Sequence, residues 1–317
     1  MENNSISSPL KWAGGKRKFS PIIIEAIKDF KTKFDYHEPF FGGGSIFFSL
    51  HSSDLIKNSY INDVVPQLVN FYKVLSKEDY LQEFIKKSKN IESKFNMLLE
   101  NENVRKEEYY KLRKTFNNNF KKLIENDLWI KNPNITLAAQ LLALNKLCFN
   151  GMFRLNSKGE FNIAIGTHKK VRFVNEDNLK RVSKSLESSK ISCKDYKHTR
   201  AFSKELNGQN LIFLDPPYIP NSPTSSFTDY SSEGFNYSKH KELSKLFSKI
   251  IKTDAKVILT NNNNSISQDL FVKNNNVYSY NIPITKTISA DPNKRGKTNE
   301  LLLSNFKITT LEKLKIN

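Results

Sequence analysis

Hydrophobic and polar positions along the chain switch repeatedly between the spacing of strands and that of helices. In the first 75 residues this pattern predicts strands at 34–40 and 58–63 and helices at 21–30, 44–50 and 64–75. After about residue 168 it predicts strands at 190–196, 210–218, 255–260 and 300–306, a Ser/Thr/Pro-rich loop up to Asn236 and a helix from Ser238. Strands that alternate with helices in this way favour an α/β fold.

The middle of the chain has a different pattern. Between residues 76 and 134, Lys, Asn and Glu dominate and apolar residues recur at a spacing of three and four, which predicts several surface-rich helices. Residues 136–149 are the most apolar predicted helix, with Thr136 as its N-cap. Residues 151–166 alternate around a central Ser-Lys-Gly, which predicts a β-hairpin.

These patterns divide the chain into two domains. We expect an α/β domain of residues 1–75 and 167–317, interrupted by a helical insertion of residues 76–166. The hairpin of that insertion is expected at residues 150–165. The insertion contains no glycine before the hairpin region, so it differs in composition from the domain that it interrupts.

Charge and composition restrict the classes of binding partner and the cellular location that we expect. Fifty Lys and Arg against 32 Asp and Glu give a net charge of +18, which makes a polyanion the first expected partner. Cys148 and Cys193 are too few for a disulfide scaffold or a four-Cys zinc site; we expect two buried thiols and no metal. No apolar run reaches 18 residues, so we expect no membrane span and a cytoplasmic location. The Asn runs at 117–119 and 261–264 are interpreted as composition bias, not as sites.

Acidic residues at strand ends are the first candidates for ligand binding. In open α/β sheets ligands bind beyond the carboxyl ends of the strands. Asp63 ends a predicted strand, Glu38 lies where a predicted strand runs into the glycine turn, and Asp215 lies where another is halted by two prolines. We therefore expect the three turns to converge on one crevice.

The turn from Glu38 to Ser45 contains three consecutive glycines. Glycines supply positive φ angles and let a ligand approach the backbone, and a following helix N-terminus offers free N–H groups. A tight loop without a ligand is the alternative. The glycines do not match G-x-G-x-x-G, which disfavours a nicotinamide dehydrogenase. Asp63, about 20 residues later, could accept the ribose hydroxyls of an adenosine-type ligand or could cap the next helix.

The segment Trp12-Ala13-Gly14-Gly15-Lys16 matches a P-loop only in part. It lacks the earlier glycine, and Arg17 stands where Ser or Thr is required, so a nucleoside triphosphatase is disfavoured. Lys16 remains a candidate for contact with a ligand carboxylate.

Asp215-Pro216-Pro217-Tyr218 is the sharpest feature of the sequence. The prolines stiffen the turn that closes an apolar strand. The Asp215 carboxylate and the Pro216 carbonyl can then face one point beside the tyrosine ring, which suits a planar amine. Two accepted hydrogen bonds would draw such an amine toward a nucleophilic form. A plain proline turn is the alternative.

With these segments in view, the chain resembles the Dam family of DNA adenine-N6 methyltransferases, whose motifs run in the order cofactor, target recognition, catalysis. The resemblance covers nearly the whole chain and rests on KWAGGK, EPFFGGGSIFF, YINDVVPQLVNFY, FNGMFRLNSKGEFN, CKDY, LIFLDPPY and ELLLSNF. It implies an α/β, Rossmann-like methyltransferase sheet with an inserted, mostly helical DNA-recognition domain that ends in a β-hairpin. Residues 76–134 carry no motif.

The resemblance implies S-adenosylmethionine as the methyl donor. The residues that it implies for cofactor binding are Trp12, Lys16, Glu38, Pro39, Phe40, Gly42, Gly44, Ser45, Asp63 and Asp195. The family places the Asp195 carboxylate on the adenine amine of the cofactor, and an N-cap is the equal alternative. Asp215, Pro216, Pro217 and Tyr218 are implied to hold a flipped target adenine.

The predicted hairpin carries the residues implied for DNA binding, because a base inside a duplex must be extruded before its N6 can react. By resemblance, Phe149 would wedge into the stack, Asn150 would meet the orphaned base, and Arg154 would read guanine, with Met152 beside them. Lys11 aligns with a lysine that contacts the first guanine. Core packing is the alternative for Phe149, and a phosphate contact or a surface charge is the alternative for Arg154.

GATC is the best single prediction for the DNA site. Ala164, however, stands where GATC enzymes carry a proline that packs on a thymine methyl, so another short site is an alternative. Double-stranded DNA is the expected partner, and the expected context is protection of DNA in a restriction–modification system, with a cognate endonuclease as a further partner. Two other functions stay open: a ribosomal RNA base methyltransferase, some of which also carry D-P-P-Y, and a DNA-binding module without catalysis.

Overall fold

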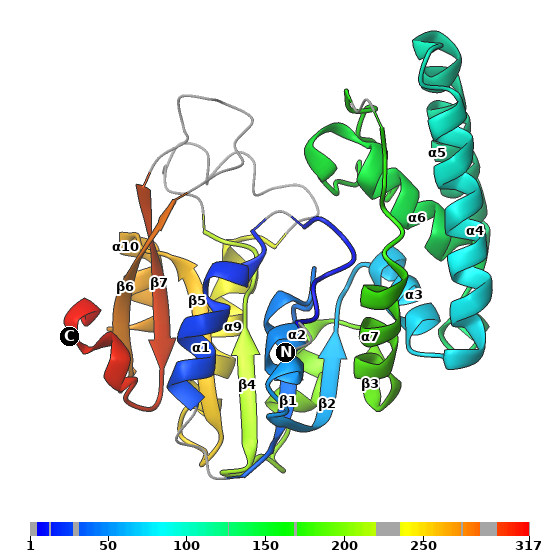
Figure 1. The fold of residues 1–317 in the computed structure, drawn as a ribbon. Helices are drawn as coiled ribbons and strands as arrows, with labels where there is room; N and C mark the ends of the chain where they lie inside the picture. Colours follow the sequence, from blue (N-terminus) through cyan, green and yellow to red (C-terminus); the bar gives the residue numbers. More distant parts are fainter. Residues whose placement is uncertain are drawn as a thin grey trace. The chain divides into compact units, whose positions relative to one another are not determined.

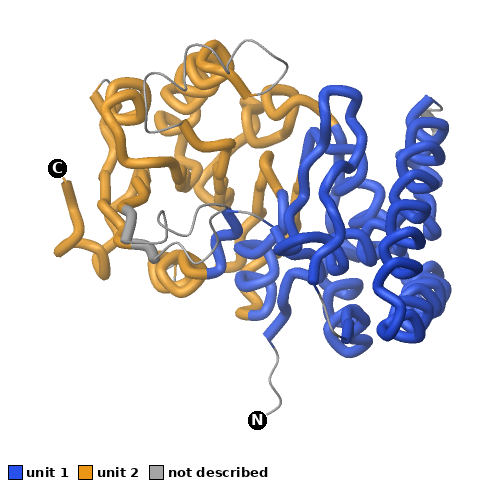
Figure 2. The backbone as a smooth tube through the Cα atoms, turned by 90° about the horizontal axis from the view of Figure 1, so that it is seen from above, with its two compact units in different colours: residues 1–17, 42–52, 63–193 blue, residues 18–41, 53–62, 194–317 orange. Residues whose placement is uncertain are grey.

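The computed structural model describes residues 5–12, 14–27, 32–125, 127–167, 170–219, 235–273, 275–285 and 297–316. The predicted Ser/Thr/Pro-rich loop falls mostly on residues 220–234, outside the described residues. The chain divides into two compact units, which Figure 2 shows in different colours. Unit 1 comprises residues 1–17, 42–52 and 63–193, and unit 2 comprises residues 18–41, 53–62 and 194–317.

Unit 2 contains a mixed β-sheet. Its strands are β1 (Phe34–Glu38), β2 (Ile56–Asn62), β4 (Asn210–Leu214), β5 (Lys256–Asn262), β6 (Tyr278–Thr285) and β7 (Lys297–Ser304). They lie in the order β2-β1-β4-β5-β7-β6. β2, β1, β4 and β5 pair in parallel, whereas β7 is antiparallel to both β5 and β6. The predicted α/β, Rossmann-like sheet is therefore confirmed.

Helices cover both faces of this sheet. Unit 2 contains α1 (Ser20–Ile27), α9 (Tyr237–Ile250) and α10 (Ser265–Phe271), with the short 3-10 helices η4 (Tyr196–His198), η5 (Arg200–Phe202) and η8 (Thr309–Leu314). Figure 1 shows α1 in front of the sheet and α9 and α10 behind it. Phe247 of α9 and Phe271 of α10 pack in one core with Leu214 and Leu259 of the central strands. Burial of this apolar surface fixes the helices on the strands whose ends carry the candidate site.

Unit 1 is mostly helical. It contains α2 (Ser45–Ser52), α3 (Pro66–Leu75), α4 (Glu78–Met97), α5 (Glu102–Ile124), α6 (Ile135–Leu147), α7 (Glu176–Glu187), the 3-10 helices η2 (Asp127–Ile130) and η3 (Phe149–Gly151), and β3 (Ser189–Ser192). A further 3-10 helix, η1 (Lys16–Lys18), spans the boundary between the units. α6 packs against α3, α4 and α5, and Figure 1 shows α4 and α5 as long neighbouring helices. The predicted helices between residues 76 and 134 are confirmed.

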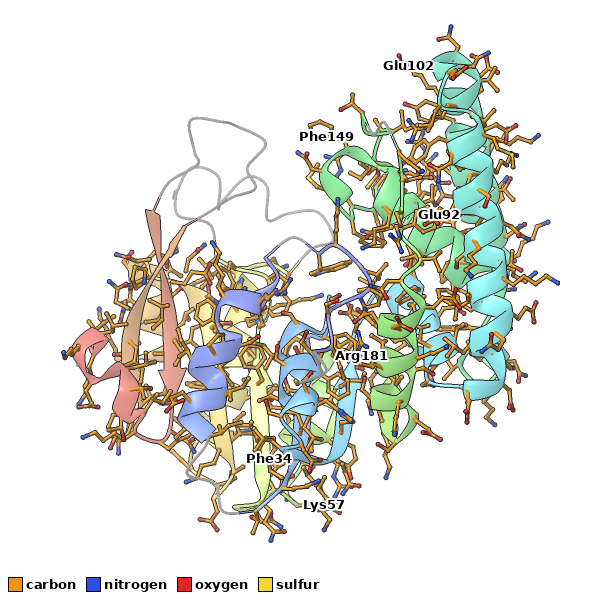
Figure 3. All side chains as sticks on the ribbon, viewed as in Figure 1. Phe34, Lys57, Glu92, Glu102, Phe149 and Arg181 are labelled. Carbon is orange, nitrogen blue, oxygen red and sulfur yellow. The ribbon has the colours of Figure 1, made fainter. Side chains whose placement is uncertain are left out.

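Side chains of α4 and α5 also hold segments that follow α6. Glu92 of α4, labelled in Figure 3, accepts hydrogen bonds from the backbone N–H groups of Phe173 and Val174. Asn96, one turn further along, exchanges two hydrogen bonds with the backbone of Val171. These contacts fix the segment that leads into α7.

Several details of the sequence prediction were wrong. α6 is capped by Asn134, whose side chain accepts from Leu137 N at 3.0 Å, so Thr136 is not the N-cap. The helix ends at Leu147, because the backbone of Cys148 is extended. The predicted hairpin has no continuous strands: within the described residues its two sides form isolated bridges, such as Leu155 to Phe161, with two backbone hydrogen bonds across that pair.

Other elements were not predicted at all. The prediction placed no helix at α7 or α10 and no strand at β6. Cys148 is buried as expected, but Cys193 is only half-buried. Among the described residues, no helix combines the length and the apolar character that a membrane span requires. The assignment of residues 1–75 and 167–317 to cofactor binding, and of residues 76–166 to target recognition, stays a prediction.

Candidate active site

The turn after β4 carries the Asp-Pro-Pro-Tyr sequence. β4 is completely buried, and Asp215 follows it in a half-buried position. Thr260 of β5 donates a hydrogen bond from Oγ1 to Asp215 Oδ1 at 2.7 Å. The Tyr218 hydroxyl donates to Glu300 Oε2 at 2.7 Å. The side chains of Asp215 and Tyr218 are therefore held by side chains of β5 and β7.

Burial also sets the state of the tyrosine. Desolvation raises the pKa of Tyr218 well above its usual value, and the charges of Asp215 and Glu300 raise it further. The phenol consequently stays protonated at any physiological pH and acts as a hydrogen-bond donor toward Glu300.

The end of β1 brings a second carboxylate to the sheet. Tyr36 and Glu38 lie on the same side of the strand, and the Tyr36 hydroxyl donates to Glu38 Oε2 at 2.9 Å. Both side chains are buried. Burial raises the pKa of Tyr36, with Glu38 as the next cause and the charge of Asp215 as a smaller one. The parallel pairing of β1 with β4 places the carboxyl ends of the two strands side by side, so Glu38 and Asp215 lie at the same edge of the sheet.

Asn62 links two turns that the sequence analysis treated separately. Its Nδ2 donates to the Pro39 carbonyl at 3.1 Å and to the Lys194 carbonyl at 2.9 Å, and its Oδ1 accepts from Lys194 N at 3.2 Å. The side chain is buried at the end of β2. Sequence reasoning missed this residue, although a buried strand that ends in a polar residue just before Asp63 was an available signal.

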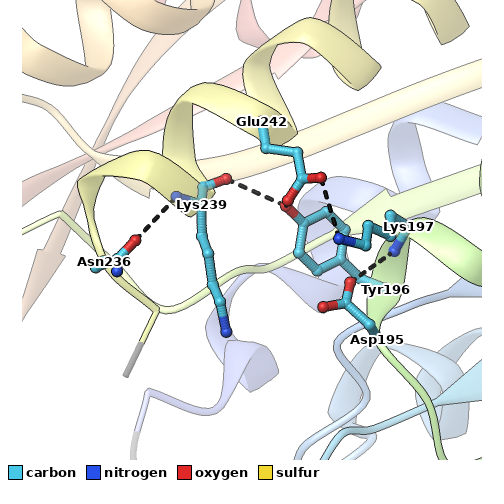
Figure 4. Close-up of polar contacts among 6 residues, drawn as sticks. All are labelled: Asp195, Tyr196, Lys197, Asn236, Lys239 and Glu242. Carbon is cyan, nitrogen blue, oxygen red and sulfur yellow. Dashed lines mark hydrogen bonds and ion pairs between the residues drawn. The ribbon is translucent and has the colours of Figure 1, made fainter. Parts of the chain in front are cut away.

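The turn at Asp195 is fixed by the first turns of α9, as Figure 4 shows. Asp195 Oδ1 accepts from Lys197 N at 3.1 Å, so the cap geometry is present. The Tyr196 hydroxyl donates to the Lys239 carbonyl at 3.1 Å, and Lys197 Nζ lies 3.2 Å from Glu242 Oε1. A carboxylate has about four acceptor sites, so this cap leaves Asp195 able to accept from a ligand as well.

An aromatic cluster lies beside this turn. The ring of Phe40, which is half-buried, lies 5.0 Å from the ring of Tyr196 and 5.6 Å from that of Phe235. Unit 2 thus combines a carboxylate at Asp195 with planar apolar surface at Phe40, a combination that suits a purine ring with an exocyclic amine.

In unit 1 the glycine turn packs directly on Trp12. Gly42 has φ +48°, and a Cβ built on it would lie 2.6 Å from Trp12 Nε1. A Cβ on Gly43 would lie 2.8 Å from Trp12 Cβ. Side chains at both positions are therefore excluded by Trp12, whose indole also stacks on Phe153 with ring centroids 5.0 Å apart. Gly44, with φ +66°, leads into α2 at Ser45.

Asp63 connects this turn to the start of α3. Its Oδ2 accepts from Gly42 N at 2.8 Å, and its Oδ1 accepts from Val65 N at 2.9 Å. Burial raises the pKa of the Asp63 carboxyl, while its backbone hydrogen bonds oppose that rise. The carboxylate is therefore a structural clamp on the glycine turn, and a role toward ribose stays a prediction. Lys16 is buried, and its Nζ donates to the Gly14 carbonyl at 2.7 Å.

The candidate DNA-binding residues lie on the segment after α6. Phe149, labelled in Figure 3, is 48% exposed, so it is not packed into the core. Asn150 is exposed and has φ +55°, an uncommon conformation for a residue with a side chain. Arg154 is exposed, and its Nε donates to Asn162 Oδ1 at 3.1 Å. Met152 is half-buried between them.

Lys11 joins this segment through a buried asparagine. Asn145 accepts from Lys11 N at 2.8 Å and donates to the carbonyls of Lys11 at 2.9 Å and Gly151 at 3.2 Å. Gly151 has φ +63°, and a Cβ there would lie 2.2 Å from Lys11 Cδ. The structure thus brings Lys11 and the Phe149–Arg154 segment together, and Asn145 is a second residue that sequence reasoning missed.

One face of α5 supports the other side of the hairpin. The Tyr109 hydroxyl and Arg113 Nη1 donate to the Ile163 carbonyl at 2.9 and 3.0 Å. One turn further, Asn117 exchanges two hydrogen bonds with the backbone of Phe161, at 3.0 and 2.9 Å. The interpretation of the 117–119 Asn run as composition bias was therefore wrong for Asn117, which holds the hairpin.

The second Asn run was misread in the same way. Asn261 Oδ1 accepts from Ile219 N at 3.1 Å, and Asn262 and Asn264 donate to the Ile219 carbonyl at 2.6 and 3.3 Å. Ile219 directly follows Tyr218, so the run fixes the backbone of the candidate catalytic turn. A position at the carboxyl end of a buried strand was the signal that could have identified it.

Comparisons with known proteins show the family of the chain. The family model of the D12 class N6 adenine-specific DNA methyltransferases matches residues 12–288. The chain is 34% identical to the type II methyltransferase M.MjaIII of Methanocaldococcus jannaschii, over 94% of this chain and 98% of that protein. It is 30% identical to the type II methyltransferase M1.LlaDCHI of Lactococcus lactis subsp. cremoris, over 93% of this chain and 94% of that protein. It is also 30% identical to a DNA adenine methylase of Vibrio cholerae, over 92% and 94%. The chain therefore belongs to the D12 class of N6 adenine-specific DNA methyltransferases.

Proposed function

We propose that this enzyme transfers the methyl group of S-adenosylmethionine to N6 of an adenine extruded from a short duplex DNA site. The observation that carries the proposal is the fixed turn after β4, where Asp215 is bonded to Thr260 and Tyr218 to Glu300. An amine inside the base stack is out of reach of such a turn, so the target base must leave the duplex.

The chemistry follows from what the turn can accept. The Asp215 carboxylate and the Pro216 carbonyl accept the two N–H groups of the adenine amine, while the Tyr218 ring supplies a stacking face. These hydrogen bonds oppose delocalisation of the nitrogen lone pair into the ring and so favour attack by N6. When bound, S-adenosylmethionine would supply an electrophilic methyl group: the methyl–sulfur bond breaks as the methyl–N6 bond forms, the thioether product leaves, and N6 releases one proton. Pro217 stiffens the turn and thereby keeps both acceptors aligned.

The donor set of the chain fits that cofactor. Asp195 with the Phe40 ring suits the adenine portion, and the buried ammonium of Lys16 suits a carboxylate. Asp63 suits the ribose hydroxyls. We assign the remaining family positions, Trp12, Glu38, Pro39, Gly42, Gly44 and Ser45, to the same binding function. The membership in an adenine-specific DNA family favours this function over a ribosomal RNA methyltransferase.

The hairpin is proposed to read the DNA. Phe149 is exposed as a stack-inserting residue would be, and the exposed Arg154 suits guanine O6 and N7. Lys11 contacts DNA from beside the hairpin, and Asn150 and Met152 complete the surface. GATC is the proposed site, with another short site as the alternative because Ala164 is exposed where a proline is expected. Protection of DNA beside a cognate endonuclease is the proposed context.

The decisive experiment measures N6-methyladenine formed in a panel of duplexes that carry GATC and every single substitution of it. Asp215→Ala is expected to lower kcat by about 10² or more, because a positioned acceptor is lost, while S-adenosylmethionine still binds in calorimetry. Asp254→Ala, an exposed aspartate of the same unit, is the matched control and should keep full activity. A variant at Asp215 that retains more than about a tenth of kcat would overturn its role. If the enzyme methylates other duplexes of the panel but not the one with GATC, the proposed DNA site is wrong and the proposed reaction still stands.

A further inference from the structure

Glu300 lies in the E-L-L-L-S-N-F segment, which the proposed function leaves without a role. It occupies β7, the strand on the far side of β5 from the catalytic turn, opposite Asn262 in the antiparallel register. Its side chain is only 9% exposed, and Leu301, Leu302 and Leu303 after it are fully buried. Burial of a carboxylate at such a position lowers the stability of the fold unless the charge is hydrogen-bonded.

The structure gives that carboxylate a specific donor. Tyr218, the last residue of the catalytic turn, donates its hydroxyl to Glu300 Oε2 at 2.7 Å. Hydrogen bonds to a carboxylate are shorter and stronger than those between neutral groups. The far edge of the tyrosine ring is consequently tied to β7, and the ring is restricted to one orientation.

The near end of the same residue is fixed as well. Asn261 and Asn262 hold the N–H and the carbonyl of Ile219, the residue that follows Tyr218. The backbone that follows Tyr218 is held by β5 and the Tyr218 hydroxyl is held by β7, so both ends of the side chain are fixed. A ring that must present one face to a flipped base needs such restraint, because displacement by about 1 Å can lower a rate by about 10²-fold.

We propose that Glu300 is a positioning residue for methyl transfer: through the Tyr218 hydroxyl it sets the orientation of the ring against which the target adenine stacks. Glu300 does not touch the adenine itself. This inference rests on the proposed function of the Asp215–Tyr218 turn.

The test compares Glu300→Ala, Glu300→Gln, Tyr218→Phe and the double variant Tyr218→Phe/Glu300→Ala on a methylatable duplex. Glu300→Ala is expected to lower kcat by about 10- to 100-fold, with KM for DNA and the affinity for S-adenosylmethionine changed by less than about twofold. Glu300→Gln keeps an acceptor for the hydroxyl and should recover most of that loss. Tyr218→Phe should act through the same bond, so the double variant should be no slower than the slower single variant, within about twofold.

Asn305→Ala is the matched structural control. Asn305 bonds Val257 N at 2.9 Å and the Ala255 carbonyl at 2.8 Å, at the opposite end of β5 from the catalytic turn. Its replacement should lower the melting temperature and leave kcat unchanged. Glu300 is not a positioning residue if Glu300→Gln gives no recovery, or if the losses from Tyr218 and Glu300 multiply in the double variant. A wild-type enzyme that methylates no adenine would overturn the proposed function and this inference together, whereas an active wild type with unaffected Glu300 variants overturns the inference alone.

Discussion

Replacement of Asn117 by alanine tests how α5 supports the hairpin that is proposed to read the DNA. The hairpin ladder uses other groups, namely Asn162 N to the Arg154 carbonyl and Asn156 N to the Glu160 carbonyl. The N–H and carbonyl of Phe161 therefore point away from the partner segment, as in a non-hydrogen-bonded antiparallel pair. The Asn117 amide satisfies both at 2.9 and 3.0 Å.

The magnitude follows from leaving those two groups unpaired. The bonds are partly buried, so the lower end of the usual cost applies, about 1 kcal/mol for each group and about 2 kcal/mol together. Alanine is the better helix former by about 0.5 kcal/mol, which reduces the expected net loss to about 1.5 kcal/mol. This corresponds to about tenfold faster exchange of the Phe161 amide hydrogen, because exchange through local opening follows the population of the open state.

The assay is native-state hydrogen exchange at Phe161, with Asn118→Ala as the control. Asn118 is an exposed asparagine on the same helix, so its replacement changes helix propensity without removing the clamp. Asn117→Ala should accelerate exchange about tenfold relative to this control and should also weaken discrimination among DNA sequences. Equal exchange at Phe161 in the two variants would refute the clamp.

Three further outcomes are expected. Asp63→Ala should weaken S-adenosylmethionine by about 1.5–3 kcal/mol in calorimetry, the range for a hydrogen bond to a charged group, and unchanged affinity would leave Asp63 as a clamp on the glycine turn alone. Arg154→Ala should weaken binding to the cognate duplex by about 1–3 kcal/mol and relax discrimination at one base pair. An equal loss of affinity for every duplex of the panel would indicate a phosphate contact instead. Burial, with the Lys11 charge as the smaller cause, lowers the pKa of Lys146 from 10.5 to about 8. The unfolded chain therefore binds this proton more tightly than the folded chain. The free energy of unfolding of the wild type should consequently rise between about pH 8 and 10.5 relative to that of Lys146→Met. An equal pH dependence of the two proteins in chemical denaturation would contradict this.

The layered fold was predictable because its signals are local. The fully buried β4 reads as a continuous apolar run, and parallel strands alternate with helices at lengths that periodicity detects. β6 escaped prediction although its apolar residues alternate at the spacing of a strand, because Pro283 disfavours an ordinary strand. Antiparallel pairing with β7 along its whole length holds this segment as a strand despite the proline.

The site was predictable only where a residue acts through its own chemical type. Asp215 and Tyr218 stand out because carboxylate, proline and phenol follow one another in the chain. Some asparagines act instead by satisfying backbone groups of segments far away in the sequence, namely Asn62, Asn145, Asn261, Asn262 and Asn264. An asparagine that completes a distant turn has the same local signature as one that faces water, so only the fold distinguishes them.

The close packing of Gly151 on Lys11 has a consequence for exchanging the proposed DNA-reading hairpin between relatives. A donor hairpin with any side chain at position 151 would collide with the Lys11 side chain, since even a Cβ comes within 2.2 Å. The Asn145 amide donates hydrogen bonds to both backbones, so its replacement would remove the bonds that join them. A chimaera that transplants only the hairpin would therefore inherit mismatched contacts. A chimaera that preserves these contacts therefore has to exchange positions 11 and 145 together with residues 149–154.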